Sequence, residues 1–280
     1  MQGIREQGDE ANEAKEANDM NQSIDAFSMD YFDLEGKVAV ITGGNTNLGM
    51  AYTIALARAG ADIFVPHFED DVSEVRDAAE KAGRRIAFFK GDLTDEDYRK
   101  SIMGKCAEAF GRVDILVNNA GISIGGAIED YSDEDYRKMV DVNLNVCYYL
   151  CRDAGLMMRE LGGGGKIINI GSALSFTGVD RGIPYPITKH GVIGLTRSMS
   201  AAFMNDNVQV NAICPGFFHS PVNKGIPQEA VDNIARRCKG GKWGEYGDLM
   251  GTVVFLASKA SDYVTGIYII VDGGFTANYF

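Results

Sequence analysis

Seven short runs of apolar and β-branched residues recur along the chain, each bounded by turn residues, and most are separated by stretches with helical patterning. They span residues 37–42, 62–66, 86–89, 114–118, 166–171, 208–214 and 268–272. Strands that are apolar on both faces need helices on both sides to exclude water, which is typical of a parallel sheet. The sequence therefore predicts an α/β fold: a single doubly wound domain with a seven-stranded parallel sheet.

Composition agrees with one domain and excludes several kinds of partner. The 280 residues are 45% hydrophobic, which suffices for one large core but not for two. A formal net charge of −12 disfavours nucleic acid and anionic membrane surfaces as partners. The sequence contains no run of eighteen apolar residues, so no membrane span is predicted. It also lacks an apolar segment near the start of the kind that a signal peptide requires. We therefore expect a cytoplasmic protein without a membrane partner.

The five cysteines are odd in number and show no metal-ligand spacing with histidine. They are Cys106, Cys147, Cys151, Cys214 and Cys238. Cys147 and Cys151 lie four residues apart on one expected helix, but two thiols without nearby histidines make a poor zinc site. We expect reduced thiols and no metal.

Residues 1–32 form an acidic N-terminal extension, and residues 33–280 form the folded domain. The first thirty residues hold eight acidic side chains against Arg5 and Lys15. Met20, Ile24, Phe27 and Tyr31 nevertheless fall at helical spacing. This stripe predicts that residues 20–32 dock on the folded body of the same or a neighbouring subunit; an unstructured leader is the alternative.

A glycine-rich turn joins the first expected strand to a helix expected at 50–59. The turn reads Thr-Gly-Gly-Asn-Thr-Asn-Leu-Gly from Thr42 to Gly49. Such a turn lets the backbone approach a pyrophosphate and directs helix amides toward it. Asn-Asn-Ala-Gly at 118–121, Ile-Gly-Ser at 170–172 and Cys-Pro-Gly at 214–216 end three later strands at the same sheet edge. These features predict a dinucleotide site there.

Tyr185 and Lys189 stand four residues apart where an apolar helical pattern begins. On a helix they share a face, and a cation one turn from a phenol favours its ionised form. The pair is a candidate proton-transfer device, although the spacing alone is common. Pro186 fits only the first turn of a helix, so the helix is expected to start close to Tyr185.

These four motifs, in this order and spacing, resemble the short-chain dehydrogenase/reductase family over residues 35–276. The resemblance implies a Rossmann-type fold and hydride exchange between nicotinamide and a substrate carbon. It implies that Tyr185 transfers the hydroxyl proton, that Lys189 assists it and holds the nicotinamide ribose, and that Ser172 hydrogen-bonds the reacting oxygen. Asn143, within Val-Asn-Leu, would anchor a water-linked proton path to Lys189.

The resemblance also implies the residues that hold the cofactor, which are Gly43, Asn45, Asn47, Leu48, Gly49, His67, Phe68, Asp92, Leu93, Asn119, Ala120, Gly121, Tyr185, Lys189, Pro215, Gly216, Phe218 and Ser220. Two positions depart from the family pattern. Asn47 replaces a glycine, which asparagine can do because it tolerates positive φ. His67 replaces an acidic ribose ligand. Because the segment after the second strand is acidic and the turn lacks Arg and Lys, we expect NAD(H) rather than NADP.

The substrate is predicted less directly, from Leu174, Phe176, Arg181, Phe217 and His219. The apolar surface of Leu174, Phe176, Phe217 and Phe218, with the terminal Tyr279 and Phe280, favours a large apolar ketone. The chain also resembles bacterial 20β-hydroxysteroid dehydrogenases, and a steroid side-chain ketone is the first expectation.

The alternative is a sugar-acid dehydrogenase, because the sequence of the C-terminal half resembles those of gluconate and 2-dehydro-3-deoxy-gluconate 5-dehydrogenases. Arg181 or Lys224 would then bind the carboxylate. A non-catalytic dinucleotide-binding protein is a remote third possibility.

The family resemblance also implies a homotetramer, formed through helices expected at 136–156 and 185–203 and through the last strand. Apolar positions assigned to these contacts are Cys147, Leu150, Met157, Val192, Leu195 and Met199.

Overall fold

The computed structural model describes residue 24 and residues 26–220 and 227–278. All strand pairings in its seven-stranded sheet are parallel, and the strand order is β3-β2-β1-β4-β5-β6-β7. The strands are β1 (Val38–Ile41), β2 (Asp62–His67), β3 (Ile86–Lys90), β4 (Ile115–Asn118), β5 (Gly165–Ile170), β6 (Val208–Pro215) and β7 (Tyr268–Val271). The predicted doubly wound, Rossmann-type fold is confirmed, and strand ends differ from the prediction by at most one residue.

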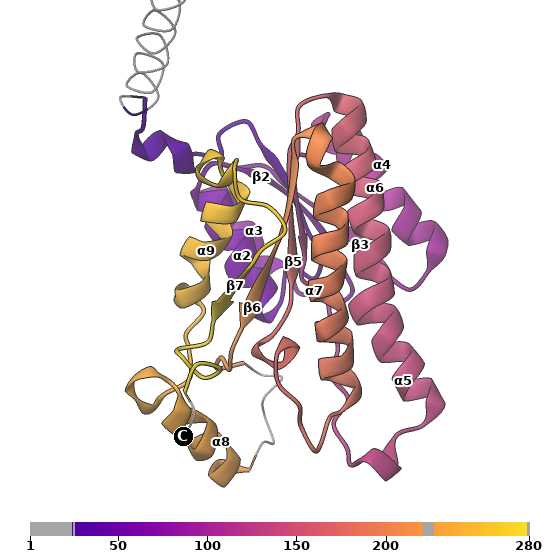
Figure 1. Ribbon diagram of the computed structural model, residues 1–280. Helices are drawn as coiled ribbons and strands as arrows, with labels where there is room; N and C mark the ends of the chain where they lie inside the picture. Colours follow the sequence, from indigo (N-terminus) through magenta and orange to yellow (C-terminus); the bar gives the residue numbers. More distant parts are fainter. Residues whose placement is uncertain (1–23, 25, 221–226, 279–280) are drawn as a thin grey trace, which may run out of the picture.

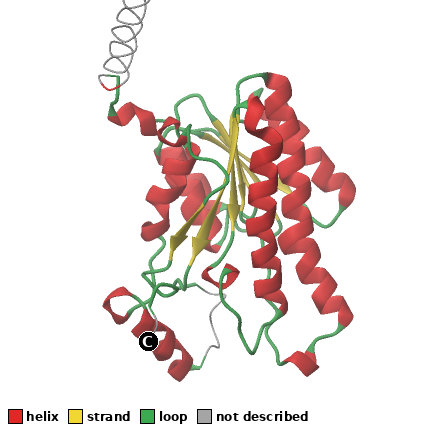
Figure 2. Ribbon diagram, in the orientation of Figure 1, coloured by secondary structure: helices red, strands yellow, loops and turns green. Residues whose placement is uncertain are grey.

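Helices cover both faces of the sheet (Figure 1). They are α2 (Asn47–Arg58), α3 (Ser73–Lys81), α4 (Glu96–Phe110), α5 (Asp133–Val140), α6 (Val146–Leu161), α7 (Pro184–Phe203), α8 (Gln228–Arg237) and α9 (Gly247–Ala257). In Figure 1, α2, α3 and α9 lie on one side, and α4, α6 and α7 lie on the other. The strand arrows point to the end of the sheet near α8, so the carboxyl ends of the strands meet there (Figure 2).

Each strand contributes to two cores because successive side chains point to opposite faces. In β1, Ala39 and Ile41 join the apolar cluster under α2 and α9, which contains Leu56 and Leu256. Val38 and Val40 join the cluster under α4, α6 and α7. All four side chains of β1 are at most 2% exposed. This two-sided burial explains why the strands read as continuous apolar runs.

The apolar residues assigned to subunit contacts mostly belong to the subunit's own core. The structure buries Cys147, Leu150, Val192 and Met199, so their assignment to subunit contacts is wrong. Cys147, Leu150 and Met199 join the apolar cluster under α4, α6 and α7, where the parallel strands need apolar cover. Exposed apolar side chains on α6, α7 and β7 are instead Tyr148, Leu156, Leu161, Ile187 and Ile270.

The N-terminal stripe is only partly described. Met20 lies outside the described residues, whereas Ile24 and Phe27 are more than 60% exposed. Tyr31, in the short 3₁₀ helix η1 (Met29–Phe32), is half-buried, with the Lys259 ammonium 4.3 Å from its ring centroid. Docking of this segment stays a prediction.

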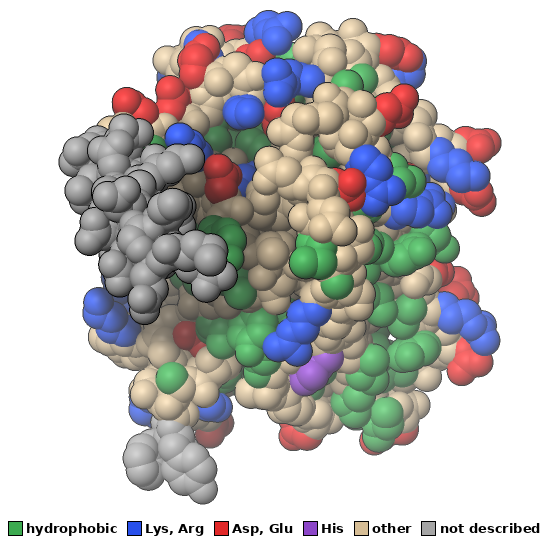
Figure 3. All heavy atoms as spheres, turned by 45° about the horizontal axis from the view of Figure 1, so that its top comes forward, with side chains coloured by type: hydrophobic (Ala, Val, Ile, Leu, Met, Phe, Trp, Pro, Cys, Tyr) green, Lys and Arg blue, Asp and Glu red, His purple; other side chains and the backbone are tan. Residues whose placement is uncertain are grey.

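No helix in the described ranges is long and apolar enough to cross a membrane. Figure 3 shows Lys and Arg side chains interspersed with Asp and Glu side chains on the face that it presents. This mixture differs from the continuous basic stripe that binds a phosphate backbone.

Candidate active site

Helix α7 carries Tyr185 and Lys189 to the carboxyl edge of the sheet. It begins at Pro184, and Pro186 lies in its first turn, where a missing N–H costs nothing, as predicted. Lys189 is 4% exposed, and its Nζ donates a hydrogen bond of 2.7 Å to the carbonyl oxygen of Ile170, the last residue of β5. The same Nζ lies 5.6 Å from the centroid of the Tyr185 ring. The ammonium is therefore held between the phenol and the end of β5.

Ser172 follows β5 directly and is tied to α7 through Ser175. The Ser172 hydroxyl accepts a hydrogen bond from Leu174 N at 3.1 Å. The Ser175 hydroxyl accepts from Ser172 N at 3.1 Å and donates to the Lys189 carbonyl at 2.8 Å. Ser175 is 2% exposed, and sequence reasoning assigned it no role. Its signal, a serine three residues after the catalytic candidate, is too common to stand out.

Asn143 lies in the π-helical segment η3 (Asp141–Asn145) between α5 and α6. Its side chain accepts from Ile122 N and donates to Ile122 O, both at 2.8 Å, and donates to Thr188 Oγ1 at 3.2 Å. A Cβ placed on Gly121 would lie 3.2 Å from Asn143 Oδ1 and 3.7 Å from Lys189 Nζ. The structure therefore brings Asn143 and Lys189 together beside Gly121. π-Helical turns are frequent at functional sites.

The glycine-rich turn is as compact as a pyrophosphate cradle requires. Gly43 has φ +61°, and a Cβ on Gly49 would lie 2.2 Å from Gly43 O and 2.5 Å from Asn119 Nδ2. Helix α2 starts at Asn47, three residues earlier than predicted, so its first amides belong to the turn itself. The turn and helix N-terminus fit a dinucleotide pyrophosphate.

Thr42 joins this turn to the end of β4. Its hydroxyl accepts hydrogen bonds from Asn119 N and Ala120 N, both at 3.0 Å, while Asn119 Nδ2 donates to Thr42 O at 3.0 Å. These hydrogen bonds therefore join the glycine-rich turn and the Asn-Asn-Ala-Gly motif at 118–121 into one side of the site. Sequence reasoning placed Asn119 and Ala120 at the cofactor but did not identify Thr42 as their link.

The end of β2 is organised by Asn45 and His67. Asn45 Nδ2 donates to the carbonyls of Glu69 at 3.2 Å and Asp71 at 2.9 Å, and His67 Nδ1 lies 2.8 Å from Glu69 O. Asn45 Oδ1 is buried without a hydrogen-bond partner among the described residues. A buried acceptor without a donor is unusual, and the hydroxyls of a nucleotide ribose are donors of the right kind.

Other expected cofactor residues lie around the same edge. The Asp92 carboxylate accepts from Thr94 N at 2.8 Å, and Leu93 O accepts from Arg99 Nη1 at 3.4 Å. Phe68 is 65% exposed beyond β2. Leu48, within the first turn of α2, is half-buried against the core under that helix. The 92–93 loop is thus fixed by its own hydrogen bonds.

The segment after β6 closes the site from the other side. Gly216 packs so closely that a Cβ would lie 2.6 Å from Asp272 Cα, and Phe218 is 4% exposed. Pro215, the last residue of β6, pairs with Val271 of β7. Ser220 Oγ donates to Asn47 Oδ1 at 3.0 Å, so this segment contacts the glycine-rich turn directly. Asn47 has φ +48°, which confirms the positive φ that the sequence predicted.

The aromatic residues predicted to line an apolar substrate pocket are half-buried and pack against other rings of the protein. Phe217 contacts the rings of Trp243 and Phe275 at centroid distances of 5.7 and 5.1 Å. Phe176 lies 4.7 Å from the Tyr268 ring. Leu174 is half-buried, and Arg181 and His219 are exposed. Lys224 lies outside the described residues. Contact of these half-buried rings with neighbouring aromatic side chains stabilises the loops that surround the site.

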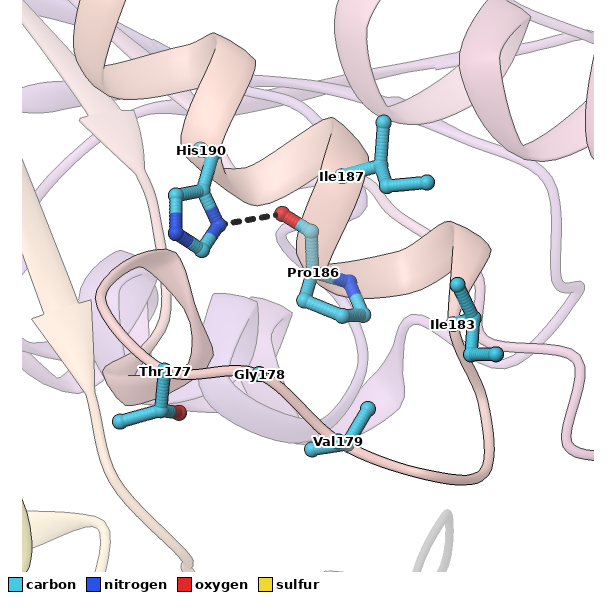
Figure 4. Close-up of a pocket in the computed structure, with 7 residues that line it drawn as sticks. All are labelled: Thr177, Gly178, Val179, Ile183, Pro186, Ile187 and His190. Atoms are coloured by element: carbon cyan, nitrogen blue, oxygen red, sulfur yellow. Dashed lines mark hydrogen bonds between the residues drawn. The ribbon is translucent and has the colours of Figure 1, made fainter.

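A cavity of about 410 Å³ lies on the outer side of the start of α7 (Figure 4). Its lining consists of Thr177, Gly178, Val179, Ile183, Pro186, Ile187 and His190. His190 Nδ1 lies 2.8 Å from the Pro186 carbonyl oxygen, and the catalytic candidates are not among the lining residues. The cavity therefore opens on a different side of α7 from Tyr185 and Lys189.

Within the part of the chain that the structure describes, no three His, Cys, Asp or Glu side chains are placed to hold a metal ion. All five cysteines are buried free thiols. Cys147 Sγ and Cys151 Sγ each lie within 3.3 Å of Asn169 Oδ1, in a buried polar network under α6. Their role is in packing between α6 and the sheet.

Known proteins share this chain's sequence and fold. A family model described as enoyl-(acyl carrier protein) reductase matches residues 43–276. Oxidoreductase YgcW of Escherichia coli (strain K12) is 41% identical over 260 residues, 91% of this chain and 98% of that protein. The 2-dehydro-3-deoxy-D-gluconate 5-dehydrogenase of Bacillus subtilis (strain 168) is 41% identical over 249 residues, 88% of this chain and 96% of that protein.

Among solved structures, a gluconate 5-dehydrogenase from Burkholderia cenocepacia J2315, in complex with NADP and tartrate, superposes with a TM-score of 0.82. It is 31% identical, and the match covers 89% of this chain and 98% of that one. The motifs, the geometry of the site and these relatives agree. The chain is an oxidoreductase that belongs to the short-chain dehydrogenase/reductase family.

Proposed function

We propose that this protein is an NAD(H)-dependent dehydrogenase of sugar acids, which interconverts a secondary alcohol and a ketone on substrates of the gluconate and 2-dehydro-3-deoxy-gluconate class. The observation that carries the chemistry is the placement of Tyr185, Lys189, Ser172 and Asn143 around the end of β5. These groups lie where the carboxyl edge of a doubly wound sheet binds its ligand. The bound nicotinamide would supply or accept the hydride.

The side chains of the site divide the proton chemistry. Tyr185 would donate a proton to the carbonyl oxygen during reduction and remove it during oxidation. The Lys189 ammonium, held by the Ile170 carbonyl, would stabilise the phenolate that Tyr185 becomes. Ser172, fixed by Leu174 N and Ser175, would donate a hydrogen bond to the reacting oxygen. Asn143 would keep the Ile122 backbone and Thr188 in place beside Lys189.

The packing of the aromatic side chains favours a polar substrate over a steroid. Phe176 and Phe217, which the hydroxysteroid expectation assigned to the pocket, contact the rings of Tyr268, Trp243 and Phe275. The exposed Arg181, on the loop before α7, is available for a carboxylate. Relatives named as 2-dehydro-3-deoxy-gluconate 5-dehydrogenases at 34–41% identity support the same substrate class.

Oxidation of NADH, followed by absorbance with a panel of keto-sugar acids and ketosteroids, tests the substrate class. The keto-sugar acids should be turned over and the ketosteroids should not. Arg181→Ala should raise KM for the sugar acid about 10- to 100-fold, because it removes a hydrogen bond to a charged group. Arg137→Ala, at an exposed arginine paired with Asp133, is the control and should leave KM unchanged. Turnover of ketosteroids alone would overturn the proposal in favour of the hydroxysteroid reading.

The preference for NAD(H) is supported by the charges beyond β2. Lys90, opposite His67 in the strand register, forms an ion pair with Asp70 and is thereby neutralised. Asn45 holds the carbonyls of Glu69 and Asp71, which keeps this acidic segment beside the turn. A 2′-phosphate would meet these carboxylates.

Asp70→Asn should therefore tighten NADPH binding about 3-fold or more at low salt, because it frees the Lys90 ammonium. The double variant with Lys90→Gln should lose that gain. Tighter binding of NADPH than NADH by the unaltered protein would refute the preference while leaving the substrate proposal intact. NADP in the Burkholderia cenocepacia structure makes this comparison necessary.

A homotetramer is also proposed, because exposed apolar side chains remain on α6, α7 and β7, namely Tyr148, Leu156, Leu161, Ile187 and Ile270. Multi-angle light scattering should give four times the 30.3 kDa chain mass. A monomer mass at micromolar concentration would contradict it.

A further inference from the structure

Asn47 occupies a backbone position that normally suits glycine. Its φ is +48°, and Asn207, with φ +54°, is the other non-glycine residue with positive φ among those the structure describes. Asparagine is one of the few residues that adopts this conformation at modest cost. A glycine would satisfy the turn equally well, so the side chain of Asn47 invites a second explanation.

The side chain bridges the two walls of the dinucleotide site. Its Oδ1 accepts a hydrogen bond of 3.0 Å from Ser220 Oγ, which lies beyond the end of β6 and 173 residues away in sequence. Because the oxygen of a planar amide is engaged, the amide orientation is fixed and both N–H bonds point away from that contact. Within the described chain, Asn47 Nδ2 donates no hydrogen bond that would occupy these donors.

These N–H donors lie at the N-terminus of a helix, where an anion can bind. Asn47 is the first residue of α2, a twelve-residue helix whose N-terminal amides favour anions. A Cβ on nearby Gly49 would strike Gly43 O at 2.2 Å, so the turn packs tightly against the helix start, as a pyrophosphate cradle requires. Asn47 adds neutral side-chain donors to this anion site without adding charge.

We propose that the Asn47 side-chain amide donates a hydrogen bond to the pyrophosphate of the dinucleotide, and that Ser220 is a positioning residue that orients this amide. The inference rests on the proposed dinucleotide site but not on the substrate class. Glycine at this position would suit the backbone but would have no side-chain donor, whereas Asn47 would add a hydrogen bond to the pyrophosphate. The Ser220 hydroxyl would thereby link the segment after β6 to the glycine-rich turn.

Binding measurements without substrate test this directly. NADH fluorescence and calorimetry with ADP-ribose, which has the pyrophosphate but no nicotinamide, would give dissociation constants for the unaltered protein and its variants. Asn47→Gly should raise both constants about 10-fold, since it removes a charge-assisted hydrogen bond while suiting the backbone. Asn47→Asp should raise them further, and added salt should reduce that excess, because a carboxylate would face the pyrophosphate.

Ser220→Ala separates orientation from a contact to nicotinamide. If Ser220 acts through Asn47, its loss should weaken ADP-ribose as well as NADH. A loss confined to NADH would overturn the positioning role. Asn207→Gly is the matched control, because it makes the same change at the other positive-φ asparagine and should leave both constants unchanged.

Asn47→Gly protein that binds NADH and ADP-ribose as tightly as the unaltered protein would overturn the proposal, because Asn47 would then serve only the backbone. Failure of the unaltered protein to bind NADH, NADPH or ADP-ribose would instead refute the dinucleotide site itself. Circular dichroism of each variant confirms that folding is retained, and Asn47→Asp provides a second variant should Asn47→Gly unfold.

Discussion

Replacement of Asn143 by alanine is the perturbation whose size the structure defines best. The side chain is 2% exposed and makes three hydrogen bonds, two with the Ile122 backbone at 2.8 Å and one with Thr188 at 3.2 Å. Alanine leaves the N–H and C=O of Ile122 without these partners. A buried polar group that loses its partner costs about 1–3 kcal/mol. Because Ile122 is only half-buried and water can reach part of it, we expect Asn143→Ala to lower the free energy of unfolding by about 2–4 kcal/mol.

The matched control is Asn145→Ala, two residues away in the same π-helical segment. Asn145 donates one exposed hydrogen bond to Asp141, so its loss should change stability by less than about 0.5 kcal/mol. Urea unfolding followed by circular dichroism gives both values. Turnover should be compared at a temperature where each variant is fully folded, and Asn143→Ala should be the slower.

Equal stability of the two variants would refute this reasoning. It would mean that Ile122 finds solvent partners without cost and that Asn143 does not hold the segment after β4. Normal turnover of stable Asn143→Ala protein would remove Asn143 from the catalytic assembly.

Three further outcomes follow from the site and its surroundings. Tyr185→Phe should lower kcat about 10²–10⁴-fold with NADH affinity nearly unchanged, because it removes only the proton donor; near-normal kcat would exclude Tyr185 as the acid-base group. Gly49→Ala should destabilise the fold by about 1–3 kcal/mol in urea unfolding, because a Cβ there would clash with Gly43 O. Gly104→Ala, at an open position in α4, should instead stabilise the fold by about 0.5–1 kcal/mol. Equal effects of the two substitutions would contradict the crowding at Gly49. Burial raises the pKa of the Cys106 thiol to about 12 and that of Cys214 to about 11, so both stay protonated at pH 8 and should react slowly with a disulfide reagent in the native protein; rapid labelling without denaturant would show that they are accessible.

The distinction between strand, turn and helix was predictable because it depends on local chemistry. Continuous apolar runs indicated strands that are covered on both faces, and the Tyr185–Lys189 spacing indicated a shared helix face. The positive φ of Asn47 followed from the conformational preferences of asparagine alone. Pro186 placed the start of α7 within two residues. Each inference needed only neighbours along the chain.

The substrate side could not be predicted in this way. Phe176 and Phe217 are apolar in any context, but whether they line a pocket or pack on Tyr268 and Trp243 depends on residues far away in sequence. The same holds for the four buried positions assigned to subunit contacts, because helical periodicity does not say whether an apolar face meets its own subunit's core or another subunit.

The sequence by itself determined the parallel sheet, the glycine-rich turn and the identity of the catalytic candidates. Only the tertiary structure decided how they are held: Asn143 reaches Ile122 from a π-helical turn, and Ser220 reaches Asn47 across 173 residues. The physical reason is the range of the interactions. Backbone preference and periodicity act over a few residues, whereas a hydrogen bond between side chains requires that folding first bring distant segments within about 3 Å.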